Sequence, residues 1–228
     1  MKAAFLDLDG TLCDGSSSAF LLRELAKEPG VHREYLDAAL EAADRKEKKG
    51  PSTLRGGIYK NYPPAVKGLD ISQVTRAAMR AWPAFRKTMF DFVPDLVELL
   101  HSEWFEVVLV TGGPEELARH VRAEYGMLAT VGARLETEAL TCTGRLAQAP
   151  AQAGGKSEYI RSTLAYGLDL EESFSMGNGI RDAEMMELTG SAVAFEPEFD
   201  LAPLAEANGW PVADRSDVLE VCERALTG

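Results

Sequence analysis

The sequence predicts an α/β fold: a parallel sheet with helices on both faces, and a helical segment inserted after the first strand. Three observations support this. The chain opens on a short apolar run that leads into Asp7-Leu8-Asp9-Gly10-Thr11. Apolar residues then recur at helical spacing from about residue 16 to residue 92. From Pro94 onward, short apolar runs alternate with amphipathic segments, which is the pattern of βαβ units.

The first apolar run is interpreted as a strand that ends in a reactive site. Side chains alternate along a strand, so Asp7 and Asp9 point the same way at its end. Gly10 permits a turn that a side chain would resist. Both carboxylates can therefore reach one ligand.

The inserted segment is predicted to hold three amphipathic helices. Their apolar faces are marked by Ala19 to Leu22 with Leu25, by Leu36 with Ala39 and Ala43, and by Val74 with Ala77, Ala78 and Trp82.

The later elements are predicted in the order helix, strand, helix, hairpin, helix and three strands. The helices span 94–100, the segment from Pro114 to Gly126, and 156–165; the hairpin spans 134–146; the strands span 107–110, 173–176, 192–195 and 212–213. In such a fold the ligand site lies at the carboxyl ends of the parallel strands.

Composition limits the classes of function. The chain has 228 residues, of which 46% are hydrophobic, enough to bury a sizeable core. A net charge of −12 argues against a nucleic-acid-binding surface, although a small anionic ligand needs only a local positive field. No apolar run has the length of a membrane helix and no secretory signal is visible, so we expect a cytoplasmic protein without membrane contact. Cys13, Cys142 and Cys222 are expected to pack as small hydrophobes; Cys13, close to the site, is alternatively an oxidisable thiol.

Three later motifs complete a recognisable set. Thr111-Gly112-Gly113 follows an apolar strand, Lys156 follows a Gly-Gly pair, and Gly177-Asn178-Gly179-Ile180-Arg181-Asp182 closes the series. Together with the first motif, this order resembles the haloacid dehalogenase superfamily, and the position of the insert resembles its phosphoserine-phosphatase-like branch. The resemblance implies a Rossmann-like core at 1–15 and 93–228 and a small helical cap domain at 16–92.

The resemblance also implies a chemistry: magnesium-dependent hydrolysis of a small phosphate monoester through an aspartyl-phosphate. Asp7 would be the nucleophile, and Asp9 the general acid and base. Thr111, Gly112 and Lys156 would bind the phosphoryl group. Mg²⁺ would be held by Asp7, by the backbone carbonyl of Asp9, and by Asn178 and Asp182. The expected partner is a small phosphorylated metabolite, and the expected assembly a monomer or homodimer.

The last motif departs from the pattern at residue 178, where an aspartate is usual and this chain has asparagine. An amide oxygen can bind Mg²⁺ but adds no negative charge. Either Asn178 and Asp182 complete a working metal site, or the chain binds phosphate esters without turnover. A phosphotransferase using the same intermediate is a further alternative. Carbon–halogen hydrolysis is less favoured because it does not need Asp9 or the metal site.

Two segments bear on the substrate. Phosphoserine phosphatases use a glutamate soon after the first motif, where this chain has Gly15-Ser16-Ser17-Ser18. These serines can bond a neutral substrate such as a polyol or sugar, or cap the next helix. The basic run Arg45-Lys46-Glu47-Lys48-Lys49, with Arg55 and Lys60, is interpreted as a solvated helix end or as a contact to a second anionic group of the substrate. Arg181 is interpreted as a phosphate contact or a solvent-facing side chain.

Overall fold

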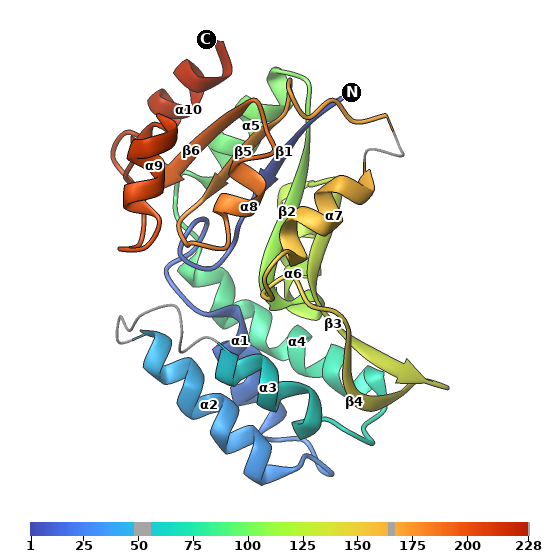
Figure 1. Cartoon of the computed structure of the whole chain (residues 1–228). Helices are drawn as coiled ribbons and strands as arrows, with labels where there is room; N and C mark the ends of the chain where they lie inside the picture. The colour runs from blue at the N-terminus through green and yellow to red at the C-terminus, as the bar shows by residue number, and fades with distance from the viewer. Residues whose placement is uncertain (48–55, 164–166, 228) are drawn as a thin grey trace.

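The computed structural model describes residues 1–47, 56–163 and 167–227, and it has a seven-stranded sheet at its centre (Figure 1). The strand order is β4-β3-β2-β1-β5-β6-β7. All neighbouring strands are parallel except β3 and β4, which form an antiparallel hairpin. The strands are β1 (Lys2–Leu6), β2 (Phe105–Pro114), β3 (Ala129–Glu138), β4 (Thr141–Gln148), β5 (Phe174–Gly177), β6 (Ser191–Phe195) and β7 (Val212–Ala213). The predicted α/β class with a mostly parallel sheet is confirmed.

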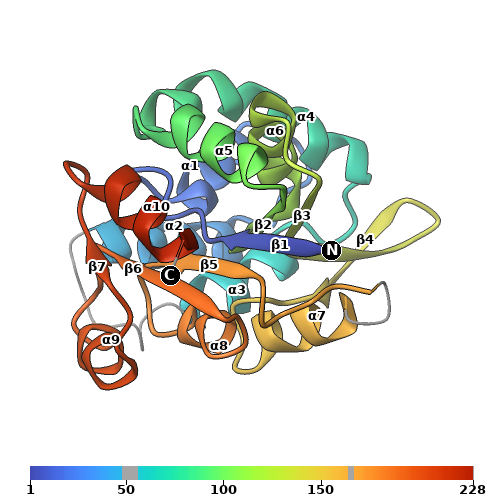
Figure 2. The same cartoon turned by 90° about the horizontal axis from the view of Figure 1, so that it is seen from above.

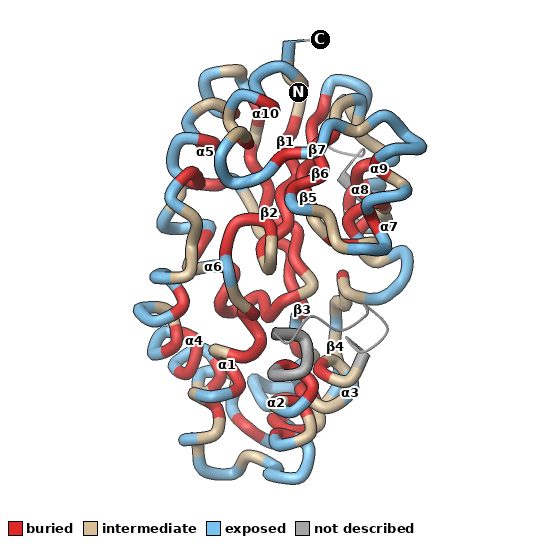
Figure 3. Tube along the Cα trace, turned by 90° about the vertical axis from the view of Figure 1, so that its left-hand side faces the viewer, coloured by how far each residue is buried: buried red, intermediate tan, exposed pale blue. Residues whose placement is uncertain are grey.

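Helices cover both faces of the sheet (Figure 2). One face carries α5 (Val93–Ser102), α6 (Glu115–Tyr125) and α10 (Val218–Thr227); the other carries α7 (Gly155–Thr163), α8 (Ala183–Met186) and α9 (Ala202–Asn208). Alternation along β1 supplies both layers, because Ala4 and Leu6 join one apolar cluster and Ala3 and Phe5 join the other. The central strands are therefore buried on both sides, as Figure 3 shows in red.

The insert after β1 is helical. It contains α1 (Ser17–Leu25), α2 (Arg33–Glu47), α3 (Gly56–Ala65) and α4 (Ile71–Phe85), followed by a 3₁₀ turn at Arg86–Thr88. The three predicted helices correspond to α1, α2 and α4. The prediction missed α3, because Pro63 and Pro64 near its end weaken the helical signal.

The insert has an apolar cluster of its own, which also takes in Leu135 and Cys142 from the β3–β4 hairpin. Figure 1 shows this hairpin reaching from the sheet to the side of α3 and α4. At the other end, Ala81 and Phe85 of α4 pack into the core cluster. We propose that 16–92 forms the cap and that 1–15 with 93–228 forms the core, with the hairpin and the end of α4 as the joints between them.

Local signals explain several element ends. Gly126 ends α6 in the left-handed conformation, with φ of 65°, as the sequence predicted. The predicted hairpin is also present, and its turn is formed by Ala139 and Leu140, both with positive φ. Its first strand begins earlier than predicted because residues from Ala129 pair with β2. The predicted helix at 156–165 corresponds to α7; residues 164–166 lie outside the described residues.

Within the described ranges, no helix has the length and apolar character needed to cross a membrane.

Candidate active site

The predicted motifs meet at the carboxyl ends of three adjacent strands. β1 lies between β2 and β5, and Leu6 is in register with Leu109 and Met176. Asp7 therefore leaves β1 beside the end of β2, which carries Thr111, and beside the end of β5, which leads into Asn178. The parallel sheet thus brings together residues that are separated by more than a hundred positions in the sequence.

Lys156, near the start of α7, reaches into the centre of this site. Its Nζ donates to Asp7 Oδ1 at 2.7 Å, to Asp182 Oδ1 at 2.5 Å and to the carbonyl of Val110 at 2.8 Å. Burial by itself would lower the pKa of this lysine, but the charges of Asp182 and Asp7 raise it overall. The ammonium therefore stays protonated and places a fixed positive charge beside Asp7.

Asp182 uses both of its oxygens inside the protein. While Oδ1 accepts from Lys156, Oδ2 accepts the backbone N–H groups of Asn178 at 3.0 Å and Gly179 at 2.8 Å. The sequence analysis expected Asp182 to help hold the metal. Because both oxygens are engaged with other groups, we propose instead that Asp182 positions Lys156 and the turn that carries Asn178.

Asp7 and Asn178 converge on Thr11, a residue of the first motif to which the sequence analysis gave no role. Thr11 Oγ1 donates to Asp7 Oδ2 at 3.1 Å and lies 3.4 Å from Asn178 Oδ1. Gly10 brings the first loop close to Asn178: a Cβ on Gly10 would lie 2.3 Å from Asn178 Nδ2. The signal for Thr11 was its place in the Asp-x-Asp-Gly-Thr motif.

These oxygens suit a magnesium ion. Mg²⁺ prefers oxygen ligands and retains several waters, so it does not need a cage of carboxylates. No group of three or more His, Cys, Asp or Glu side chains in the described part of the chain has metal-binding geometry. We therefore propose a mixed donor set: the Asp7 carboxylate, the Asn178 amide oxygen and the backbone carbonyl of Asp9.

The Asp9 side chain is directed to the start of α1. Its Oδ1 accepts the backbone N–H of Ser17 at 2.9 Å, so the carboxylate lies at the positive end of the helix. Ser16 is the N-cap, and its side chain accepts from the Ala19 N–H at 3.4 Å. The expected capping role for one of the serines is confirmed.

Thr111 and Gly112, which were predicted to bind phosphate, lie near the end of β2, where its pairing with β3 is irregular. Thr111 Oγ1 accepts the N–H of Gly113 at 2.9 Å and is buried. Space over Gly112 is narrow, because a Cβ there would lie 3.1 Å from the Cβ of Ala151 and 3.5 Å from Tyr59 Oη. A side chain at residue 112 would therefore crowd Ala151.

Tyr59 of α3 belongs to this site, although the sequence analysis gave it no role. Its hydroxyl lies 3.4 Å from Ser18 Oγ. Burial and the charge of Asp9 raise the pKa of this phenol, so it stays neutral. The sequence analysis could not place Tyr59 because it did not predict α3, the helix that carries this residue.

The other predicted contacts lie elsewhere. Arg181 pairs with Glu184 at 3.5 Å, and its side chain is about half exposed. Lys60 is exposed and lines a groove of about 660 Å³ between α3, β4 and α7. Lys48, Lys49 and Arg55, and the side chains of 45–47, lie outside the described residues.

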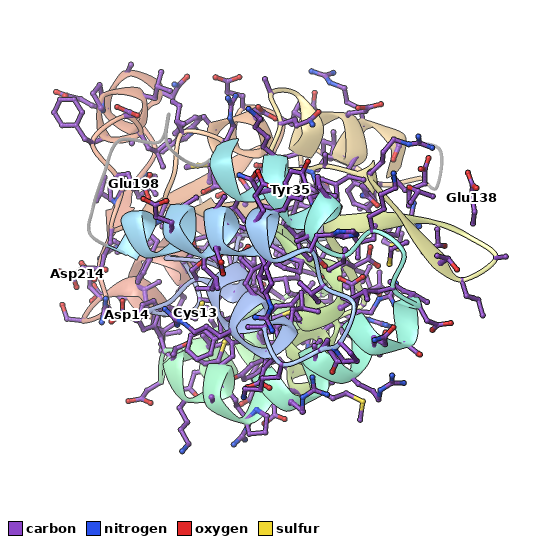
Figure 4. All side chains as sticks on the ribbon, turned by 90° about the horizontal axis from the view of Figure 1, so that it is seen from below. Cys13, Asp14, Tyr35, Glu138, Glu198 and Asp214 are labelled. Carbon is purple, nitrogen blue, oxygen red and sulfur yellow. The ribbon has the colours of Figure 1, made fainter. Side chains whose placement is uncertain are left out.

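All three cysteines are buried and none forms a disulfide. The Cys13 thiol donates to the carbonyl of Leu8 at 3.4 Å, which supports the packing interpretation. Cys13 is fully buried, and Figure 4 shows Glu138 at the far end of the hairpin.

The comparison with known families decides the classification. A sequence profile of the haloacid dehalogenase-like hydrolases matches residues 4–187. The chain belongs to this family. The predicted membership is therefore confirmed, and the match includes all four motifs that meet at the site.

Relatives connect this haloacid dehalogenase-like hydrolase with one branch of the family. It is 26% identical over 217 residues to a phosphoserine phosphatase of Mycobacterium tuberculosis, covering 93% of this chain and 70% of the relative. A phosphoserine phosphatase of Methanocaldococcus jannaschii is 24% identical, with 85% of each chain covered.

Solved structures show the same fold. A phospho-aspartyl intermediate analogue of phosphoserine phosphatase aligns with a TM-score of 0.63 at 20% identity, over 96% of this chain and 97% of that chain. A Bordetella pertussis protein of unknown function aligns with a TM-score of 0.71, also at 20% identity, over 94% and 98%. These structures share the predicted fold, and the proteins to which the chain is similar include phosphoserine phosphatases.

Proposed function

We propose that this hydrolase is a magnesium-dependent phosphatase that cleaves a small phosphate monoester through a phosphorylated Asp7. The observation that carries the proposal is the contact of Asp7 Oδ1 with a buried, protonated Lys156 at 2.7 Å. A carboxylate held beside a fixed positive charge can attack an anionic phosphoryl group, since that charge offsets the repulsion between them.

In the first half-reaction, a carboxylate oxygen of Asp7 forms a bond to phosphorus, and the bond from phosphorus to the ester oxygen breaks. The Asp9 carboxyl group gives its proton to the departing alkoxide. The phosphoryl oxygens are held by the end of β2 at Thr111 and Gly112 and by the ammonium of Lys156. The products are an alcohol and an aspartyl-phosphate.

In the second half-reaction, the Asp9 carboxylate takes a proton from water, and the water oxygen attacks phosphorus. The bond between phosphorus and Asp7 then breaks and inorganic phosphate leaves. Asp9 suits both steps because Oδ1 is fixed by the Ser17 N–H at 2.9 Å, which sets the orientation of the carboxyl group.

A bound Mg²⁺ supplies charge neutralisation at the phosphoryl oxygens. Asp7, Asn178 and the Asp9 carbonyl are the groups that would hold it, and Asp182 would orient the turn that carries Asn178.

Asn178 also keeps a second candidate open, namely a protein that binds phosphate esters without turnover. The amide of Asn178 would add no negative charge to the metal site, so Mg²⁺ would bind less tightly there. This is the one feature that favours the binding function over catalysis. The two candidates differ in their products, because only the phosphatase releases phosphate. A phosphotransferase would give a phosphorylated acceptor alcohol when one is added.

The decisive experiment measures phosphate release from phosphorylated sugars, polyols, amino acids and nucleotides, with and without Mg²⁺. Asp7→Asn protein is the control, because asparagine keeps the size of the side chain and removes its nucleophilic carboxylate. Magnesium-dependent release that is absent in the control supports the phosphatase. If neither the wild type nor Asn178→Asp protein releases phosphate, while esters still raise the melting temperature, the binding function replaces it.

A further inference from the structure

A buried hydroxyl without a hydrogen-bond partner lies at the edge of the candidate active site. Ser17 is fully buried, and its Oγ has no hydrogen-bond partner among the residues that the structure describes. Buried hydroxyl groups are nearly always paired because leaving one unpaired costs free energy. A group from outside the protein, such as a substrate hydroxyl or a water molecule, would satisfy Ser17 Oγ.

The surroundings of Ser17 show where that group would lie. The Ser17 backbone N–H is bonded to Asp9 Oδ1, so Ser17 is next to the general acid candidate. Ser17 also lies close to the end of β2 that is proposed to bind phosphate. A Cβ placed on Gly113 would lie 2.1 Å from Ser17 Oγ and 3.2 Å from Thr111 Oγ1. The hydroxyl of Ser17 is thus located between the acid and the phosphoryl site.

The leaving alcohol must occupy this same region, because Asp9 has to reach the ester oxygen to protonate it. Two further hydroxyls, those of Ser18 and Tyr59, lie together here at 3.4 Å from one another. The pKa of Tyr59 is raised by burial and by Asp9, so its phenol can both donate and accept a hydrogen bond. Segment 15–18 contributes no charged side chain.

We infer that Ser17, Ser18 and Tyr59 form a leaving-group subsite that takes the hydroxyl groups of a polyol or sugar phosphate. This inference rests on the proposed phosphatase function and names its substrate class. Neutral hydroxyls that donate and accept are matched by alcohol groups, whereas an ammonium group would need a carboxylate of its own at this place. All three residues come from the proposed cap, Ser17 and Ser18 from the start of α1 and Tyr59 from α3, and they face the core at Asp9 and Gly113.

The first test compares esters that differ only in hydroxyl groups. Erythritol 4-phosphate is paired with butyl phosphate, sorbitol 6-phosphate with hexyl phosphate, and O-phosphoserine is measured beside them. We expect the wild type to have a higher kcat/KM for the polyol ester in each pair. In Ser17→Ala protein this preference should fall about tenfold, the effect of one lost hydrogen bond. Tyr59→Phe should reduce it in the same direction.

Matched controls separate recognition from damage to the fold. Ser102→Ala and Tyr35→Phe make the same chemical changes at exposed positions on α5 and α2, and they should keep the wild-type preference. Because Ser17 Oγ has no partner among the described residues, Ser17→Ala should have a melting temperature equal to or above that of the wild type. If Ser17 had only a structural role, Ser17→Ala would instead lower the melting temperature and leave the preference for the polyol esters unchanged.

A binding experiment tests the subsite without turnover. In Asp7→Asn protein, calorimetric titration with erythritol 4-phosphate should show about tenfold weaker binding when Ser17→Ala is added. The inference would be overturned if Asp7→Asn protein and the double variant bound erythritol 4-phosphate equally well, or if neither bound it. A preference of the wild type for O-phosphoserine would also overturn it. If the wild type released no phosphate but the binding of erythritol 4-phosphate still depended on Ser17, the phosphatase function would be overturned. The subsite would still be supported.

Discussion

Asp182 Oδ1 lies 2.5 Å from Lys156 Nζ, and this contact holds a lysine from α7 against the nucleophile candidate at the end of β1. The second oxygen of Asp182 accepts two backbone N–H groups of the 178–179 turn. One carboxylate thus connects Lys156, the phosphate-binding candidate, to the turn that carries Asn178, the metal-ligand candidate.

Asp182→Asn should disrupt both ends of this connection. An asparagine has one oxygen acceptor, so its NH₂ group must face either the Lys156 ammonium or the backbone N–H groups. Breaking a buried ion pair costs about 3 to 5 kcal/mol, so we expect a loss of that order in the free energy of unfolding, measured by urea titration. Glu220→Gln is the control, because its pair with Arg224 is exposed and should leave the unfolding midpoint unchanged. Equal midpoints for the two variants would contradict the positioning role.

Asn178→Asp should tighten magnesium binding. The substitution adds a negative charge where the structure places an amide oxygen 3.4 Å from Thr11 Oγ1, close to Asp7. The magnesium concentration that gives half-maximal phosphate release should fall, and calorimetric titration with Mg²⁺ should show the same shift. Asn208→Asp makes the same change on the exposed end of α9 and should have no effect. An unchanged magnesium dependence in Asn178→Asp protein would show that residue 178 is not a ligand.

Gly10→Ala should impair the site beyond its effect on the backbone. Gly10 has φ of +90°, and an added Cβ would lie 2.3 Å from Asn178 Nδ2. Gly68 has a similar φ of +85° but open space around it, so Gly68→Ala should show the backbone cost alone, about 1 kcal/mol of unfolding free energy. We expect Gly10→Ala to lose more stability and, unlike the control, to weaken the response to Mg²⁺. Identical losses would mean that the contact with Asn178 has no consequence.

Glu116 should make stability depend on pH. This buried residue in the first turn of α6 has a pKa raised to about 7, mainly by burial and also by Glu115, against the effects of its own backbone N–H and Arg119. The folded protein therefore favours the protonated carboxyl. Its contribution to stability is fully present below the unfolded pKa of 4.5 and is lost as the pH rises through about 7.

The variant Glu116→Gln stays neutral and avoids this loss. Its free energy of unfolding relative to wild type should rise by about 2 kcal/mol between pH 5 and pH 8, measured by urea titration at each pH. Glu98→Gln, an exposed change on α5, is the control and should show no such trend. A difference between Glu116→Gln and wild type that is constant with pH would contradict the raised pKa.

The sequence predicted the sheet and most helices because their signals are local. Continuous apolar runs indicated strands that are buried on both faces, Gly126 ended α6, and Ser16 capped α1. The sequence analysis did not predict α3, α8, α9, α10 or the start of β3, and two of these omissions have a clear physical cause. Two prolines obscured α3. The start of β3 was missed because its pairing with β2 is a contact between distant segments.

The sequence by itself determined the α/β class, the inserted helices and the residue types of the site, because periodicity and motif order are properties of neighbours in the chain. Only the tertiary structure decided how those residues are used. It places Asp182 against Lys156, pairs Arg181 with Glu184, and brings Tyr59 of α3 beside Ser18 of α1. The direction of a side chain depends on partners that folding brings together from distant strands and helices, and local patterns do not record those partners.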